Sequence, residues 1–265
     1  MPQRENMRTF DLSASWLPRA FRVLAALALA LAVWAPGLAV AAVDDDVDVA
    51  LSVASLLRSA RTVISTNQDR INDPKLGDKG LSGDVVVRMA VEANVKSGGL
   101  DPQKIDPASR QGQLLSAMIS AIKEVMTANQ KIINEPGVGF KGFVPAVFGR
   151  LVTEQFRSEV GAKANIKVTA PPELVRNRKA APDEFETRVI KSKFQSPNWP
   201  TGKVYSEKTT EKGRPATRVL VPEYYGVGCL SCHGNPKGAI DITGYPKEGA
   251  NLNDLGGVIS ISLFH

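Results

Sequence analysis

The sequence predicts an α+β fold in which helices come first and a mainly antiparallel sheet follows. Apolar residues recur at helical spacing as far as about residue 161. Beyond that point, β-branched residues gather in short alternating runs, which is the pattern of strands. No linker rich in Pro, Gly and Ser interrupts residues 42–265, so we expect one continuous domain there.

Local start and stop signals set the boundaries of four expected helices. Asn72–Pro74 ends the first, because a residue that precedes proline disfavours helical backbone. Ser82 can cap the second, Asp106 followed by Pro107 opens the third, and Pro145 opens the fourth. The expected ranges are 48–72, 82–95, 106–134 and 145–161.

Strands are expected after residue 161, with one short helix among them. The alternating or β-branched runs are Asn165–Thr169, Lys203–Thr209, Ala216–Val221 and Gly257–Phe264. The short helix covers Asp183–Phe194.

One segment is repeated within the helical half. Residues 63–80 recur as residues 125–142 at a constant offset of 62, with nine identical positions. Each copy is a helix end followed by a loop rich in Asn, Pro and Gly, residues that stop helices. Two interpretations stay open: a helix-stop device used twice, or two pseudo-equivalent helices that line one site.

The first 41 residues have the pattern of a secretory signal peptide. Val23–Val43 contains no charge, and Arg19 and Arg22 precede it. Ala39–Ala41 is a small-residue cleavage signal. We therefore expect export to the periplasm, with an uncleaved membrane anchor as the alternative, because twenty-one uncharged residues are just long enough to span.

Composition excludes several classes of protein. The formal net charge is +6, from 33 Lys+Arg against 27 Asp+Glu, and no basic run suggests a nucleic-acid partner. Two cysteines are too few for a disulfide-rich scaffold or for an iron–sulfur cluster held by four cysteines.

The segment from Cys229 to His233 is the motif that indicates a cofactor site. It reads C-x-x-C-H, the attachment signature of c-type haem. Two thiols about one helical turn apart can add to the two vinyl groups of the porphyrin. His233 then supplies a neutral imidazole nitrogen to the iron. The motif predicts one covalently attached haem c, with Cys229 and Cys232 as attachment points and His233 as iron ligand.

Three other uses of this motif were weighed. A thioredoxin-like redox pair needs a strand-to-helix junction beside a parallel sheet. A zinc site would have to combine both cysteines with His233 and His265. A structural disulfide is the third alternative. The predicted export favours haem, because c-type haem is attached outside the cytoplasm.

Further segments match a known pattern: Asn67-Gln68 with Ile71–Pro74, Gly142–Phe148 with Arg150, Arg176-Asn177 with Ala181–Glu186, and Cys229–Gly234. On these segments the chain resembles the PAS-like, single-haem family of periplasmic c-type haem proteins, which also serves as the sensor domain of some bacterial histidine kinases. The resemblance runs from about residue 50 to the C-terminus. It implies a sheet with flanking helices, one covalent haem, and a role in redox or ligand sensing.

The chain departs from that family on the distal side of the iron. One branch binds iron through the motif histidine and a cysteine that lies on the helix before the Arg-Asn segment. Here that thiol is absent, and its place should fall near Val147–Arg150, at Phe148. We therefore expect an apolar distal wall at Phe148 and a five-coordinate or weakly six-coordinate haem that is open to CO or NO. Competing ligands are Met118, Met126 and His265.

Arginines are candidates for contact with the haem propionates. Arg176 and Arg150 could hold a propionate through paired N–H groups, and Arg178 and Lys179 are weaker candidates. The alternative for this basic segment is a solvated loop.

These observations favour an exported sensor or redox-responsive accessory protein whose partner is a small gas or a redox protein. A periplasmic mono-haem cytochrome c that carries electrons is the alternative. An enzyme such as a peroxidase is a third class. It is not expected, because no distal acid or base can be placed. No kinase segment follows in the sequence, so we expect any signal to pass to a separate signalling or electron-transfer protein.

Overall fold

Helices and strands follow one another along the chain in the order that the sequence predicts. The computed structural model describes residues 41–265, and Val43–His265 form one compact unit. The predicted leader lies outside the described residues except for Ala41, at which α2 begins. Within the described part, no helix combines the length and apolar character needed to span a membrane.

The helical half contains three long helices, one of intermediate length and two single turns. They are α2 (Ala41–Thr66), α3 (Gln68–Ile71), α4 (Gly83–Lys96), α5 (Arg110–Ala128), α6 (Gln130–Ile133) and α7 (Pro145–Val160). The expected cap is confirmed at Ser82, whose side chain accepts a hydrogen bond from the backbone N–H of Val85. The expected first and third helices are each interrupted by an asparagine, at Asn67 and Asn129.

The predicted start of the third helix is wrong by three residues, because its N-cap is Ser109 and not Asp106. Asp106 bonds the backbone N–H of Ala108 and so makes its own turn instead of capping a helix. Ser109 is the cap, accepting from the N–H of Gly112. A Cβ atom on Gly112 would lie 2.1 Å from the carbonyl oxygen of Asp106, so only glycine fits this close turn.

The sheet has the strand order β1-β4-β3-β2. Its strands are β1 (Ala164–Thr169), β2 (Tyr205–Glu211), β3 (Arg214–Tyr224) and β4 (Leu255–Phe264). All three pairs of neighbouring strands in this sheet are antiparallel. The α+β prediction is therefore confirmed, and the sheet that was expected to be mainly antiparallel is entirely so.

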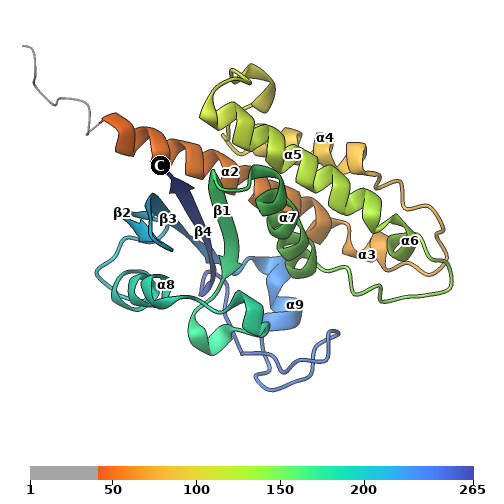
Figure 1. Cartoon of the computed structure of the whole chain (residues 1–265). Helices are drawn as coiled ribbons and strands as arrows, with labels where there is room; N and C mark the ends of the chain where they lie inside the picture. Colours follow the sequence, from red (N-terminus) through yellow and green to blue (C-terminus); the bar gives the residue numbers. More distant parts are fainter. Residues whose placement is uncertain (1–40) are drawn as a thin grey trace, which may run out of the picture. The chain divides into compact units, whose positions relative to one another are not determined.

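Each face of the sheet carries its own apolar cluster. Ile166, Val219 and Ile261 are paired across three strands and join the main core with α2, α5 and α7 (Figure 1). The opposite face is covered by α8 (Glu184–Val189) and the π-helical turn Ile190–Phe194, which together confirm the expected short helix.

The repeated loops bind each other reciprocally. The side-chain oxygen of Asn72 accepts from the backbone N–H of Lys141 at 2.9 Å. In the equivalent bond, Asn134 accepts from the N–H of Lys79 at 3.0 Å. A backbone bond from Gly137 to the carbonyl of Pro74 also joins the loops.

Other bonds of the repeat follow the same symmetry. Gln68 donates to the carbonyl of Phe143, and Gln130 donates to the carbonyl of Leu81. Lys79 and Lys141 are buried, and each donates its ammonium protons to two carbonyls of its own loop. The helix-stop interpretation is therefore correct but incomplete. Each loop ends its own helix and also forms hydrogen bonds with the other loop.

We predict that Asn72→Ala and Asn134→Ala destabilise the protein to the same degree. Each change leaves a loop N–H without its acceptor, which costs about 1–3 kcal/mol. Urea unfolding measures the free energy. Asn198→Ala, at an exposed position, is the control and should change it by less than about 0.5 kcal/mol. We call these reciprocal hydrogen bonds between the repeated loops the clamp. A loss of stability in only one of the two variants would contradict it.

Candidate functional site

The C-x-x-C-H motif lies immediately beyond the end of β3. A single 3₁₀ turn over Val227–Cys229 leads into the short helix α9 (Leu230–His233). Both cysteines are free and half-buried, and helical spacing of three residues places them on one side of this turn. Gly234 ends α9 by donating its N–H to the carbonyl of Leu230. A Cβ atom there would lie 2.6 Å from that same oxygen.

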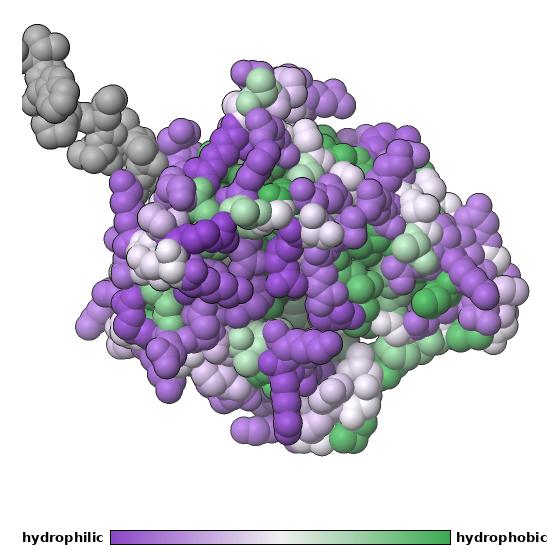
Figure 2. Space-filling view, in the orientation of Figure 1, coloured by the Kyte–Doolittle hydropathy of each residue, from purple (hydrophilic) through white to green (hydrophobic). Residues whose placement is uncertain are grey.

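Exposed apolar side chains lie in the turn that contains the motif and in the loop that follows it. Val227 is 78% exposed, and the loop that follows α9 exposes four more large apolar residues: Ile240, Ile242, Tyr245 and Leu252. Figure 2 shows pale and green residues at the lower end of the molecule, where Figure 1 draws this loop. Apolar surface gathered in this way is typical of a binding site.

His233 is held by two neighbours on one edge of its ring. Its Nδ1 lies 2.9 Å from Oε2 of Glu248 and 3.3 Å from the hydroxyl of Tyr225. The Tyr225 ring stacks on the imidazole at 4.8 Å between centroids. Burial, and then the negative charge of Glu248, raises the pKa of Tyr225 to about 12, so its hydroxyl stays protonated. Among the described residues both bonds of the imidazole use Nδ1, which leaves Nε2 available.

Arg176 connects the motif to the loop that follows it. Its Nε and one terminal nitrogen bond the two oxygens of Glu248 at 2.7 and 2.9 Å. The same guanidinium bonds Oδ2 of Asp241 at 2.6 Å and the carbonyl of Cys232 at 2.9 Å. Four donor–acceptor contacts thus converge on one side chain.

Both carboxylates of this cluster are ionised. Burial alone would raise the pKa of Glu248, but bonds from Arg176 and His233 outweigh it and lower that pKa. Burial also opposes ionisation of Asp241. Bonds from Thr243, Arg176 and the backbone N–H of Tyr245 nevertheless hold the pKa of Asp241 well below its ordinary value.

Glu248, Asp241 and Tyr225 were missed by the sequence analysis. Tyr225 precedes the motif by four residues, and the two acids follow it in a loop with no periodic pattern. Only the fold of that loop brings them to His233. Their one sequence signal is their position close to the motif.

The expected distal residues lie on α7. Phe148 is fully buried in the main core and meets Phe143 edge to face at 6.0 Å. Arg150 is half-buried and pairs with Glu154 at 2.9 Å on the same helix. Among the described residues, no hydrogen bond or ring contact joins Phe148 or Arg150 to the motif.

The helix α7 and the motif nevertheless meet the same stretch of α2. A Cβ atom on Gly149 would lie 3.0 Å from Cδ of Arg61, and one on Gly228 would lie 3.2 Å from the hydroxyl of Ser65. Arg61 and Ser65 are one helical turn apart. The segment that contains Phe148 and the segment that contains the cysteines therefore both pack on the end of α2.

The alternative iron ligands are placed elsewhere. Met118 and Met126 are fully buried in the main core on α5. His265 bonds Asp46 at 3.0 Å beyond the end of β4, whereas the motif lies near the start of that strand. Ten strand residues span about 30 Å, so His265 cannot reach the motif.

Two alternative uses of the motif are contradicted. The distance of His265 from the motif contradicts the zinc site, and the antiparallel sheet contradicts the thioredoxin-like redox pair.

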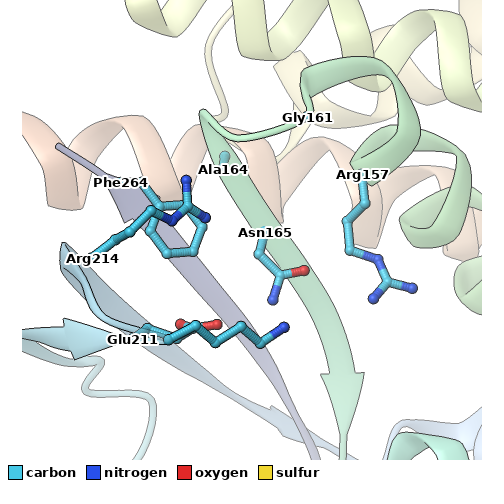
Figure 3. A pocket seen from close by; sticks show the side chains of 8 residues that line it. Arg157, Gly161, Ala164, Asn165, Glu211, Arg214 and Phe264 are labelled. Atoms are coloured by element: carbon cyan, nitrogen blue, oxygen red, sulfur yellow. The ribbon is translucent and has the colours of Figure 1, made fainter.

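A concavity away from the motif lies where β1 begins and β4 ends. It has an empty volume of about 440 Å³. Figure 3 shows Asn165 of β1 between Arg157 of α7 on one side and Glu211 and Arg214 of the β2–β3 hairpin on the other, with Phe264 beside Arg214. It shares no residue with the motif, so it is not the candidate cofactor site.

The residues of the motif fit a covalently attached haem. Two free thiols lie at the required spacing, and the imidazole has its second nitrogen available. The carboxylate at Nδ1 is the usual partner of a metal-ligating histidine. Exposed apolar side chains next to the motif suit a porphyrin face.

Comparison with known proteins gives one match. The model of the family described as Tll0287-like matches residues 102–263, more than half of the chain. No curated protein and no solved structure matches.

We predict that Asp241→Asn flattens the acid dependence of stability. The pKa of Asp241 is lower in the folded than in the unfolded protein. Its stabilisation is therefore complete above an unfolded pKa of about 3.9 and disappears as the pH falls through the folded value. The variant should be less stable by about 1–3 kcal/mol at pH 7, with a smaller difference at pH 2.5. Unfolding free energies measured across this range test it, and parallel profiles would contradict it.

Proposed function

Because the chain belongs to the Tll0287-like family, a PAS-like haem-binding family, we propose that it is an exported protein with one haem c. The observation that carries this proposal is the C-x-x-C-H turn, in which both thiols are free and His233 keeps Nε2 available. The proposed role is sensing of redox state or of a small gas. Residues 1–41 would direct export to the periplasm, where haem c is attached.

Cys229 and Cys232 would hold the haem by thioether bonds, and His233 would ligate it through Nε2. When bound, the haem supplies an iron that changes oxidation state and can take a small ligand. Tyr225 fixes the plane of the imidazole by stacking on it. Arg176 fixes the backbone of the motif by bonding the Cys232 carbonyl.

The distal side is proposed to be apolar and open. Phe148 stands where the family resemblance leads one to expect a thiol, and an aromatic side chain cannot coordinate iron. Phe148 is fully buried in the main core, so this assignment rests on the resemblance and on the packing of α7 and the motif against the same end of α2. Contact of Arg150 or Arg176 with haem propionates stays a prediction. Arg176 has most of its donors engaged, so Arg150 is the freer of the two.

The second candidate is an electron carrier. It is favoured by the exposed apolar residues beside the motif, since a carrier needs an accessible haem edge and a surface on which its redox partner docks. The ligand-binding test below separates the two roles, because a carrier limits reorganisation with a strong sixth ligand.

We predict covalent haem in a 1:1 ratio. Full-length protein, made with the c-type maturation machinery, should keep a haem stain on a denaturing gel. Replacing both Cys229 and Cys232 by Ser should abolish the stain. The control is Ser231→Ala, between the two attachment points, which should retain it. A colourless wild-type protein would refute the proposed function.

We predict that the ferrous protein is high-spin and binds CO rapidly. Absorption spectra of the oxidised, reduced and CO-treated protein measure this. His265→Ala should leave them unchanged, because His265 lies at the far end of β4. A low-spin ferrous form that resists CO, and becomes high-spin in Met118→Ala or Met126→Ala, would instead support the carrier.

A further inference from the structure

Nδ1 of His233 contacts two groups that require opposite protonation states of this nitrogen. The hydroxyl of Tyr225, at 3.3 Å, could donate to an unprotonated Nδ1. The carboxylate of Glu248, at 2.9 Å, can only accept, so it requires a proton on Nδ1. The shorter contact is the one with the charged partner, and an unprotonated Nδ1 would place its lone pair against that carboxylate. Glu248 therefore decides which ring nitrogen carries the proton.

Arg176 holds the position of Glu248. Two parallel N–H···O bonds form the bidentate pairing that fixes both distance and orientation of a carboxylate. The guanidinium is itself held by Asp241, whose side chain is fully buried, and by the carbonyl of Cys232. Glu248 is thus anchored to the same backbone that carries the motif.

The charges of this cluster do not cancel. One guanidinium, Arg176, faces two carboxylates, Glu248 and Asp241, which leaves one net negative charge. Oε2 of Glu248 accepts from both Arg176 and His233. His233 therefore bonds to an oxygen of Glu248 that Arg176 also holds.

We propose that Glu248 is the positioning residue of the iron ligand and that it sets the haem reduction potential. By taking the Nδ1 proton into a short bond, it directs Nε2 to the iron and gives the imidazole imidazolate character. A more electron-donating ligand stabilises ferric over ferrous iron, so Glu248 lowers the potential. This inference rests on the proposed haem function and adds to it the control of the resting oxidation state.

The test is the reduction potential of the full-length holoprotein with Glu248→Gln. Glutamine keeps the size and an acceptor oxygen but removes the charge, so the potential should shift to a more positive value. Covalent haem content should stay at that of the wild type, because the cysteines are untouched. In the ferrous protein, the iron–histidine stretch should move to lower frequency, a change that a merely structural role would not produce.

Glu223→Gln is the matched control. Glu223 is also a partly buried carboxylate held by arginines, with its side chain 15% exposed against 18% for Glu248. It bonds Arg58 and Arg61 and no ring nitrogen. Its neutralisation should shift the potential several-fold less than that of Glu248.

Equal shifts in the two variants would overturn the proposal, since they would reflect net charge alone. If Glu248→Gln does not retain haem, Glu248→Asp keeps the charge and should show an intermediate shift. If both Glu248 variants lose haem while circular dichroism shows an intact fold, the proposed control of the reduction potential by Glu248 is also overturned. A wild-type protein without haem would refute the proposed function instead, so the two failures are distinguishable.

Discussion

The geometry of the motif depends on one guanidinium. Arg176 bonds residues 56, 65 and 72 positions further along the chain, and one of them, Glu248, bonds the ring of His233. Breaking a partly buried ion pair leaves a charge without compensation, which is strongly destabilising. The loop after α9 contains only one isolated β-bridge, between Ile240 and Pro246, and the Arg176 cluster ties it to the motif through Asp241 and Glu248.

A second constraint comes from the repeated loops. They follow the single turns α3 and α6, which come directly after α2 and α5, and their reciprocal bonds join these two helix ends. The last turns of α2 carry Arg61 and Ser65, on which α7 and the motif pack. The clamp therefore acts on the candidate site indirectly, by holding the helix end on which both sides of that site rest.

Most of the fold could be predicted because its signals are local. Periodicity located the helices and strands, and Ser82 and Pro145 marked helix starts correctly. The prediction failed at Asp106, where a polar side chain satisfied its own turn and Ser109 took over as cap. It also could not tell that the repeat pairs with itself, because the bonding partners lie 55 to 69 residues apart.

The sequence by itself determined which residues would attach the proposed haem. Two thiols and an imidazole in five residues need only one helical turn to be brought together, and any fold that exposes this turn preserves their spacing. Which ring nitrogen of His233 stays available was decided by the tertiary structure alone. Which nitrogen would face the iron of the proposed haem follows from Tyr225 and Glu248, and Glu248 reaches His233 only after β3 and β4 pair and the loop between them closes. Hydrogen bonds between such distant groups leave no periodic trace in the sequence.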